Sequence, residues 1–482
     1  MNLSGKPCRD LMVAAAMISL ALLLSACSVT SGKGPTGVAS AAPSSRFASP
    51  AQEEPGKGAG LGAWEMEDLR RIPQQLAGLA KAAEQRLTIS DACLTRLLDE
   101  FQRRFFAPWT SSSPLFDIAD TKGVMQEDAR HDWYGVNKRK VAWKQMQELL
   151  ANCALAGFPS RSDAAIAVAP GHLRGLPTRL PLFVGAEDEP FDMLSYPQVK
   201  LNEPLRVLHV SRDGVWLFVE TGYSNGWIEA REVALVDKAF IDSWMQAPHL
   251  VIVRDFTPIA DGKQVASYRS KLGTILPIAR AEESWWDVAI ASAGEGGKAE
   301  TRTSRIPRDA AAPFPMEFDK DNIAMIGDQL LGQAYGWGEI YDLRDCSAML
   351  RDFFLPFGIW LPRTSADQVD SIPRRIALAA LAPQEKTALI GKKALPFLTL
   401  LYKPGHIMLY VGVDSEGRPL VFHDAWSIRV KEGAEEQTKI VGISAVTTLE
   451  PGKELGLVPG SSILERSTEL ATITERCRER PQ

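Results

Sequence analysis

The sequence predicts an α+β protein of several domains, with a helical N-terminal region, two small β-barrels and a C-terminal domain of mixed helices and strands. Three observations predict this organisation. A chain of 482 residues, 45% of them hydrophobic and 23% charged, is too long for one ordinary domain. Apolar residues recur at helical spacing up to about residue 165. They then occur in short β-branched runs broken by turns, and beyond about residue 313 both spacings appear.

The first residues have the pattern of a bacterial export signal. Lys6 and Arg9 precede the apolar run LMVAAAMISLALLL, which is too short to span a bilayer comfortably. The letters LSAC follow and resemble the lipobox, at which a signal peptide is removed before a lipidated cysteine. We therefore expect a lipoprotein signal peptide over 1–26, lipidation of Cys27 and a periplasmic, membrane-anchored protein. An ordinary signal peptide with an incidental cysteine is the alternative. Because no aspartate follows Cys27, the outer membrane is the favoured membrane.

Low-complexity sequence follows and then gives way to helices. Residues 27–63 are mostly Gly, Ser, Ala and Pro with few bulky side chains, so we expect a flexible tether. Within 64–165, SDACLTRLLDEFQRRFF has apolar residues at helical spacing and Ser90 as a candidate N-cap. The segment VAWKQMQELLANCALAGF repeats the spacing. These two segments predict a helical domain over 64–165.

Short strands and tight turns dominate the next two stretches. PLRVLHVSRDGVWLFVETGYSNGWIEA predicts at least three strands, and a similar texture follows Pro248. Two tandem small barrels, over 166–240 and 241–312, are the economical interpretation. GYSNG in the first of them has the spacing of a serine-hydrolase motif, but strand-like residues follow Ser224 where that motif needs a helix. We therefore interpret GYSNG as a hairpin turn.

Cys346 stands where a thiol can do chemistry. DNIAMIGDQLLGQAYGWG predicts a helix ended by glycines, and the chain re-enters a helix at Cys346, anchored downstream by apolar residues such as Phe353 and Phe357. The thiol therefore lies in the first helical turn. Unsatisfied backbone N–H groups and the helix dipole favour a thiolate there, which is the form that nucleophilic catalysis requires.

Two downstream histidines can complete a catalytic set. GHIMLYVGV places His406 at the start of a strand, DSEGRP makes a turn, and LVFHDAW returns with His423. The two histidines are thus expected on adjacent antiparallel strands. The register at the turn decides whether their rings share a face. A cysteine, a base and an orienting group are the components of a nucleophilic triad.

These motifs together resemble the NlpC/P60 cell-wall cysteine peptidases, a papain-like family. The resemblance is carried by YGWGEIYDLRDCSAML, LPRTSADQ, PGHIMLYVGV and VFHDAW, in that order. It implies a papain-like α+β peptidase domain over 313–482, with Cys346 as nucleophile, His406 as general base and His423 as the orienting residue. Upstream, FFAPW, YGVNKRKVAW and RGLPTRLP resemble the helical stabilising domain that precedes paired bacterial SH3 barrels in one branch of the family. The two predicted barrels are therefore expected to be SH3-like.

The same resemblance implies a substrate. Members with this domain order resemble endopeptidases that cut peptidoglycan stem peptides between γ-D-glutamate and the diamino acid. By this resemblance Asp345 and Ser347 bind the free amino terminus of L-alanine, and Tyr335 lines the groove. Tyr223 of the first barrel is a further candidate for the closed end of the groove, with an ordinary barrel-surface aromatic as the alternative. Intact wall and released muropeptide both remain open as substrates.

Two residues near the groove depart from the family pattern. Glu339 stands where a second glycine is common, and Ala348 replaces the usual glycine after the Cys-Ser pair. We expect these departures to affect substrate detail more than activity.

Composition and residue spacing argue against other classes of function. A net charge of −5 and a pI near 5.9 provide no basic field for nucleic acid. No Cys, His and Asp cluster has metal-ligand spacing, and no Gly-rich loop precedes a helix as a phosphate cradle, so we expect neither a metal nor a cofactor. We expect a monomer whose partners are peptidoglycan or muropeptide and, through its lipid, a membrane. The competing class is a non-catalytic wall-binding scaffold lipoprotein.

Three other cysteines need an account. Cys93 and Cys153 lie on apolar helix faces, and we expect both to be buried thiols. A disulfide between these two is the alternative in an oxidising compartment. The sequence assigns no role to Cys477, which lies in the charged tail TERCRERPQ.

Overall fold

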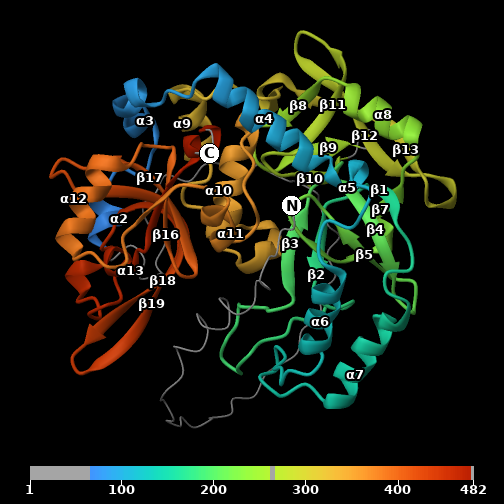
Figure 1. Cartoon of the computed structure of the whole chain (residues 1–482), viewed down its shortest axis with the longest axis horizontal. Coiled ribbons are helices and arrows are strands. Elements are labelled where there is room, and N and C mark those ends of the chain that lie inside the picture. The colour runs from blue at the N-terminus through green and yellow to red at the C-terminus, as the bar shows by residue number, and fades with distance from the viewer. Residues whose placement is uncertain (1–65, 261–265, 479–482) are drawn as a thin grey trace, which may run out of the picture.

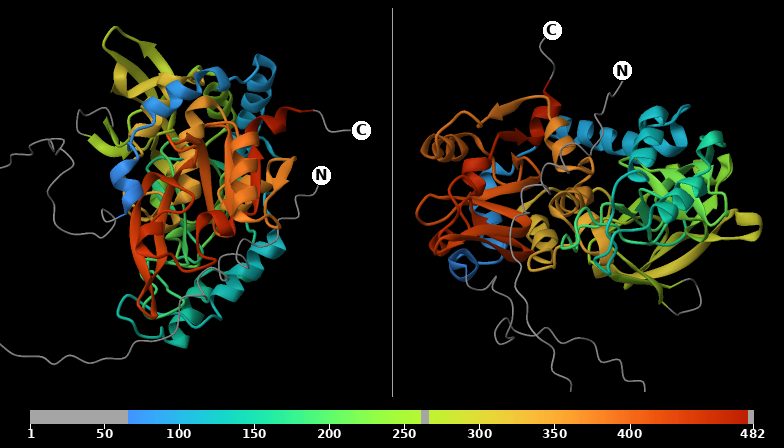
Figure 2. Two further views of the ribbon diagram at one scale, coloured as in Figure 1. Left: turned by 90° about the vertical axis from the view of Figure 1, so that its left-hand side faces the viewer. Right: turned by 90° about the horizontal axis from the view of Figure 1, so that it is seen from below.

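The computed structural model describes residues 66–260 and 266–478, and it confirms the expected α+β class. The chain forms two lobes in Figures 1 and 2, one containing the C-terminal sheet and the other the two barrels, with helix α10 (Cys346–Phe354) at their junction. The predicted signal peptide, Cys27 and the whole of the predicted tether over 27–63 lie outside the described residues, as does the rest of the segment before Met66. Within the described ranges, no helix combines the length and apolarity needed to cross a bilayer.

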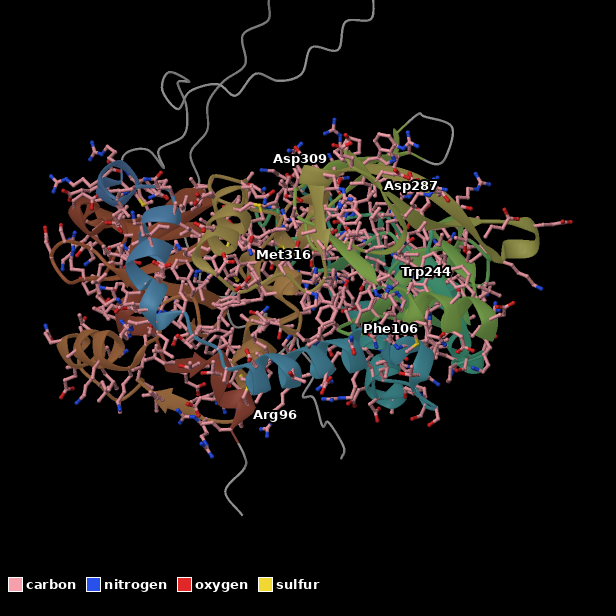
Figure 3. All side chains as sticks on the ribbon, turned by 90° about the horizontal axis from the view of Figure 1, so that it is seen from above. Arg96, Phe106, Trp244, Asp287, Asp309 and Met316 are labelled. Atoms are coloured by element: carbon pink, nitrogen blue, oxygen red, sulfur yellow. A yellow bond between two sulfur atoms is a disulfide. The ribbon has the colours of Figure 1, made fainter. Side chains whose placement is uncertain are left out.

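Helix α4 (Asp91–Phe105) bridges the two lobes. The Ser90 side chain caps it by accepting a hydrogen bond from Cys93 N at 3.4 Å, and Leu97 and Phe101 are buried. Figure 3 shows α4 running from Arg96, near the end of the chain, to Phe106 beside the barrels. Three further helices of this region follow: α5 (Ala107–Thr110), α6 (Ile118–Asp128) and α7 (Trp143–Asn152).

Two short upstream helices pack on the C-terminal domain instead, namely α2 (Glu67–Arg71) and α3 (Ala77–Ala83). Asp68 accepts hydrogen bonds from the backbone N and the hydroxyl of Thr448, both at 2.8 Å. Gln74 exchanges two hydrogen bonds of 2.9 Å with the backbone of Val446. Residues 66–83 thus cover the C-terminal sheet, although the sequence pattern grouped them with the helical domain.

The first barrel is a seven-stranded antiparallel sheet in the order β3-β2-β6-β5-β4-β1-β7. Small and β-branched side chains, among them Ala165, Val207 and Val219, fill its interior. The GYSNG segment makes the hairpin between β5 and β6, where Thr221 N donates to Ser224 O at 2.8 Å. The strands are β1 (Asp163–Ala167), β2 (Gly171–Arg174), β3 (Ser195–Val199), β4 (Pro204–Val210), β5 (Trp216–Glu220), β6 (Asn225–Glu229) and β7 (Val233–Leu235).

The second barrel follows the linking helix α8 (Lys238–Gln246). It comprises a five-stranded sheet in the order β13-β12-β11-β8-β14 and a separate hairpin of β9 and β10. Leu250, Leu276 and Ile306 belong to its buried core. The strands are β8 (His249–Ile252), β9 (Thr257–Ala260), β10 (Ala266–Ser270), β11 (Ile275–Ala281), β12 (Trp285–Ala293), β13 (Ala299–Pro307) and β14 (Ala311–Pro313).

The C-terminal domain packs α10 against a six-stranded antiparallel sheet in the order β15-β20-β16-β17-β18-β19. Met349 and Phe353 of α10 share one buried core with Leu409 and Phe422 of the sheet. The strands are β15 (Arg375–Ala377), β16 (Thr399–Lys403), β17 (His406–Val413), β18 (Pro419–Glu432), β19 (Glu435–Thr448) and β20 (Glu469–Thr472). The other helices are α9 (Lys320–Asp328), α11 (Ser365–Asp370), α12 (Pro383–Lys393) and α13 (Ile463–Arg466).

The cysteine predictions need one correction. Cys93 on α4 forms a disulfide with Cys477, 384 residues further along the chain. The expectation of a free thiol at Cys93 is therefore wrong, because the C-terminal segment folds back onto α4 and brings the two Cα atoms within 5.2 Å. Cys153 is a buried free thiol, as predicted.

Buried ion pairs join both barrels to the segment around α10. Lys200 of the first barrel lies 2.7 Å from Asp352 of α10, and Asp255 of the second barrel lies 2.6 Å from Arg344. Arg344 also binds Asp352 at 2.8 Å, and all four side chains are at most 8% exposed. Charges removed from water in this way must be paired, so the docking of both barrels and the position of the helix that begins with Cys346 depend on each other.

Candidate active site

Cys346 is the first residue of α10. Asp345 caps the helix, since its Oδ1 accepts a hydrogen bond from Ala348 N at 3.0 Å. The apolar residues of α10 are held in the core below, which fixes the thiol at the end of the sheet. The backbone N–H of Ile407 hydrogen-bonds to the thiol. Cys346 therefore lies beside His406, the residue before Ile407 and the first of β17.

The two histidines share one face of the sheet. Leu409 of β17 pairs with Phe422 of β18, so His423 stands opposite Met408, two residues after His406 and on the same face. His406 Nε2 and His423 Nδ1 are 2.8 Å apart. The register that the sequence left open thus brings the two rings into hydrogen-bond contact.

A chain of hydrogen bonds fixes which ring nitrogens carry protons. The Thr447 hydroxyl donates to Thr448 O at 2.8 Å, so its oxygen accepts from His423 Nε2–H at 2.9 Å. His423 Nδ1 is then an acceptor for His406 Nε2–H. The remaining nitrogen of His406, Nδ1, is left with a lone pair, as a general base requires. Sequence reasoning missed Thr447, whose role depends on its pairing with β18.

The pKa shifts favour a neutral thiol beside a neutral imidazole. Burial raises the pKa of Cys346 to about 12, and the neighbouring carboxyls of Asp345 and Asp424 add to the rise. Burial lowers the pKa of His406 well below its ordinary value, with further lowering by the cation of Lys403. The thiolate expected from the helix start is outweighed by burial, because the interior penalises charge. A thiol that attacks from this arrangement would pass its proton to His406.

On its other side the thiol adjoins an ionised, paired carboxylate. Arg363 Nη2 lies 2.6 Å from Asp345 Oδ2, and Ser347 Oγ donates to Asp345 Oδ1 at 3.0 Å. Gly338 N donates to Asp345 Oδ2 at 3.2 Å. Burial would raise the pKa of Asp345, but Arg363 and these hydrogen bonds hold it below its usual range. The structure thus brings Asp345 and Ser347 together, with partners already in place.

Glu339, which replaces a common family glycine, anchors this arrangement. Its backbone has φ 69°, the left-handed region in which glycine is the usual residue. Its buried carboxylate lies 2.9 Å from Arg363 and 3.0 Å from Arg351. The two guanidiniums compensate for the buried charge and the unusual backbone. Glu339 therefore positions Arg363, which in turn holds Asp345.

Asp424 is a carboxyl at the site that sequence reasoning missed. It follows His423 on β18 and is 1% exposed, and its buried Oδ1 has no hydrogen-bond partner among the described residues. Burial raises the pKa of Asp424 well above its ordinary value, and the charge of Asp345 adds to the rise. Both Cys346 and Tyr335 lie within its electrostatic range. A buried, unpaired acid beside a nucleophile is typical of a recognition or catalytic role.

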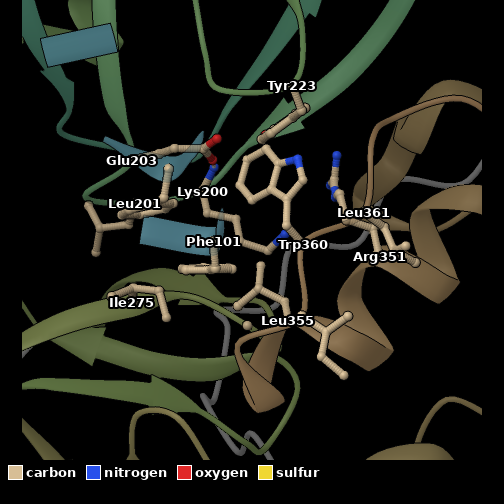
Figure 4. Close-up of a pocket in the computed structure, with 13 residues that line it drawn as sticks. Phe101, Lys200, Leu201, Glu203, Tyr223, Ile275, Arg351, Leu355, Trp360 and Leu361 are labelled. Carbon is tan, nitrogen blue, oxygen red and sulfur yellow. Dashed lines mark hydrogen bonds between the residues drawn. The ribbon is translucent and has the colours of Figure 1, made fainter. Parts of the chain in front are cut away.

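The structure separates the two candidate tyrosines. Tyr335 lies at the site, half-buried, within electrostatic range of Asp345 and Cys346. Tyr223 instead lies in a small cavity at the junction of the domains, where Figure 4 shows it beside Trp360 and Arg351. Its hydroxyl donates to Gln198 O at 3.0 Å, and its ring stacks under Arg351 at 4.3 Å. The hairpin turn directs Tyr223 into this junction, so a role at the closed end of the groove stays a prediction.

Aromatic residues from two domains meet near Tyr335. Phe191, from a loop of the first barrel, packs edge-on against Trp337 at 5.2 Å and Trp426 at 5.4 Å. Tyr335 also packs against Trp426, with ring centroids 5.6 Å apart. The first barrel therefore reaches the catalytic domain through Phe191, a residue that carried no motif. Among the described residues no group of three or more His, Cys, Asp and Glu side chains is arranged to hold a metal ion.

Models of four domain families match the chain in sequence. They are the NLPC_P60 stabilising domain, N term, at 16–158; the SH3 domain of SH3b1 type at 181–229; the SH3 domain of SH3b2 type at 237–283; and the NlpC/P60 family at 332–438. The last range contains Cys346 and both histidines. No curated protein sequence matches the chain significantly.

One of the solved structures that match this chain shares its fold. An NlpC/P60 endopeptidase from Photobacterium damselae subsp. piscicida is 20% identical, with a TM-score of 0.76 over 84% of this chain and 98% of its own. An NlpC/P60 family protein from Bacillus cereus is 15% identical, with a TM-score of 0.39 over 58% of this chain and 82% of its own. The four domain matches, in the order that the sequence motifs predicted, show that the chain belongs to the NlpC/P60 family of cysteine peptidases.

Proposed function

We propose that this protein is a lipid-anchored periplasmic endopeptidase that hydrolyses the γ-D-glutamyl-diamino acid bond of peptidoglycan stem peptides with a free N-terminal L-alanine. The observation that carries the proposal is the line of hydrogen bonds from Thr448 O to His406, which leaves a base at the residue beside Cys346. A neutral thiol with an oriented base is suited to attack on a peptide carbonyl. Family membership supports the wall as the source of the substrate.

The carboxyls beside the thiol support a substrate with a free amine. Asp345 is already paired with Arg363, whereas Asp424 has a buried oxygen without a partner. An ammonium placed between them would pair Asp424 and relieve its repulsion with Asp345. The amino terminus of L-alanine is such a group. We therefore assign Asp424 a share of the recognition that the family resemblance assigned to Asp345 and Ser347.

The disulfide supports a location outside the cytoplasm. A structural disulfide such as Cys93–Cys477 persists in oxidising compartments, and the periplasm is one. Lipidation of Cys27, attachment to the outer membrane and a monomeric state remain proposals from the sequence. Metabolic labelling with a fatty acid tests the anchor: label should appear on the wild-type chain and disappear in Cys27→Ser.

The activity is tested with defined stem peptides. The mature protein is incubated with L-alanyl-γ-D-glutamyl-diamino acid peptides, and the products are identified by mass spectrometry. We expect cleavage after γ-D-glutamate, and no cleavage by Cys346→Ala with unchanged thermal stability. Absence of cleavage by the folded wild-type protein, with binding retained, would favour the wall-binding scaffold. Cleavage by Cys346→Ala would exclude the cysteine mechanism.

A further inference from the structure

A lysine without a counterion lies beside the two histidines of the site. Lys403 is the last residue of β16 and pairs directly with His406, the first of β17, across the turn of Pro404 and Gly405. Directly paired residues of antiparallel strands point to the same face of the sheet, so these two side chains are neighbours. His423 adjoins His406 from β18 on that face. Lys403, His406 and His423 therefore form a row across three strands.

The ammonium of Lys403 has no partner in the described part of the chain. Its side chain is half-buried, and it makes no hydrogen bond or ion pair with a described residue. Burial, together with the cation of Arg466, lowers the pKa of Lys403 to about 8. An ionised Cys346 thiol opposes this shift. A partly buried cation in these surroundings favours an anionic ligand that can pair with it.

Arg466 is a second cation without a counterion in this region. It ends α13, and two residues later the chain reaches β16, where Thr468 N donates to Tyr402 O at 2.8 Å. This hydrogen bond holds the end of α13 near Lys403, so the two cations act on each other. The Arg466 side chain is half-buried and makes no hydrogen bond or ion pair with a residue in the described ranges. Two neighbouring cations repel each other, and an anion bound by both removes that repulsion.

The two cations lie on the histidine side of the thiol. Burial lowers the pKa of both histidines, and the charge of Lys403 lowers it further. Lys403 does not contribute to the shift of the pKa of Asp424, which burial and Asp345 raise. In peptide hydrolysis the base that takes the nucleophile's proton returns it to the leaving nitrogen. The residue that leaves must therefore lie against His406, and so within reach of Lys403.

We propose that Lys403 and Arg466 together bind a carboxylate of the diamino acid that leaves the stem peptide on hydrolysis. The inference rests on the proposed function and deepens it, because it assigns residues to the leaving side of the cut bond. The substrate would then be held by its ammonium on one side of the thiol and by a carboxylate beyond the histidines. The α-carboxylate and a side-chain carboxylate share this chemistry, and the test distinguishes them.

The test compares three stem peptides on the mature protein. They are L-alanyl-γ-D-glutamyl-diaminopimelate and two forms of it, in which either the α-carboxylate or the side-chain carboxylate of the last residue is an amide. Amidation of the carboxylate that the two cations bind should lower kcat/KM by about tenfold, because charge-assisted hydrogen bonds are lost. The form that suffers this loss identifies the bound carboxylate. Lys403→Met and Arg466→Met should each reduce the loss, and the double variant should abolish it.

Two control variants show whether the positive charge is what matters. Lys403→Arg keeps a cation and should keep the loss of kcat/KM on amidation. Lys392→Met removes an exposed lysine of α12 in the same domain and should also keep it. Thermal unfolding of each variant provides the control for folding. A loss on amidation that persists in the folded double variant would overturn the inference, even if the overall rate falls, since the two cations would then act only on the histidines.

Other outcomes separate this inference from the proposed function. Equal cleavage of all three peptides by the wild type would overturn the inference and leave the proposed function standing. A folded wild-type protein that cleaves none of them would contradict the proposed function instead. Calorimetric binding of the same peptides to Cys346→Ala then tests the two cations without catalysis: weaker binding of one amidated form supports the inference, and equal binding of all three overturns it.

Discussion

The polar groups on the two sides of Cys346 differ in how completely they are paired. On one side, two histidines and Thr447 form a line in which each hydrogen bond has a defined donor and acceptor. On the other side, Asp345 is ionised and paired with Arg363, whereas Asp424 has a buried oxygen without a partner. A satisfied line fixes the geometry of a reaction, and an unsatisfied buried group favours whatever ligand can pair it. Under the proposed function, the difference teaches that chemistry and recognition of the amino terminus use opposite sides of one thiol.

The largest expected effect comes from removing the base. His406→Ala should lower kcat by about 10²–10⁴-fold, because it removes the neutral imidazole that is oriented to take the thiol proton. His423→Ala should cost less, since an orienting residue makes and breaks no bond. Steady-state kinetics on a free-amine stem peptide, with thermal unfolding as the control for folding, provide the measurement. A loss of kcat in His423→Ala larger than that in His406→Ala would mean that His423 is the base and His406 the orienting residue.

The next effect tests the recognition side. Acetylation of the L-alanine amine should lower kcat/KM at least a hundredfold, since a lost buried charge pair costs about 3–5 kcal/mol. In Asp424→Asn most of this preference should vanish, because an amide does not form an ion pair with an ammonium. Comparison of the free and acetylated peptides on both proteins measures it. An unchanged preference for the free peptide in Asp424→Asn would mean that Asp345 alone recognises the ammonium.

The same interaction should release a proton. The pKa of Asp424 is raised well above its ordinary value by burial and by Asp345, so the free carboxyl holds its proton to higher pH than usual. Pairing with an ammonium favours the ionised form and expels that proton. Calorimetric titration of Cys346→Ala with the free-amine peptide, in two buffers of different ionisation enthalpy, would detect the release. The double variant with Asp424→Asn should show none, and equal release by both proteins would point to another group.

A smaller effect is expected from Thr447. Thr447→Val removes the acceptor that sets the tautomer of His423, which costs about 1–1.5 kcal/mol, or roughly tenfold in kcat. KM should be unchanged, because Thr447 is on the catalytic side. Thr447→Ser keeps the hydroxyl and is the matched control that should retain wild-type kcat. A change in KM rather than kcat would contradict the separation of a catalytic side and a recognition side at Cys346.

The smallest effect on activity is expected at the disulfide. Cys477→Ser removes the link to Cys93, far along the chain from the thiol, so kcat should stay within about twofold. Stability should fall by about 2–5 kcal/mol, as is usual when a native disulfide is lost. Thermal unfolding of the variant, compared with wild type in the presence and absence of reductant, measures the difference. A matched loss of activity and stability would show that the C-terminal segment also supports the site.

Local patterns in the sequence predicted much of this site. The helix start at Cys346 and the two strands of the histidines follow from hydrophobic spacing and turn residues over windows of about twenty residues, and the order of the domains follows from motifs. The fold class is confirmed on that basis. The partners of Cys93 and Asp345 were not predictable, because each depends on chain segments that are brought together only by folding.

Two further residues show the same limit. Asp424 lies next to a motif histidine, yet its significance comes from a buried oxygen that lacks a hydrogen-bond partner. A sequence does not show which polar atoms are paired in the folded protein. Tyr223 was a candidate for the closed end of the groove, with a barrel-surface aromatic as the alternative, and the turn that carries it points into the junction between the domains. Side-chain direction at a hairpin depends on packing from other domains, which periodicity does not report.

The Cys93–Cys477 link closes the chain between these two residues into a covalent ring. A protease that cuts once in any loop between these two residues leaves both fragments attached to each other. The barrels, the catalytic sheet and the site between them would then stay at the same local concentration, and the cut ends could be held by the surrounding contacts. Two cuts are needed before a piece can leave. This topology gives the protein tolerance to a single proteolytic cut.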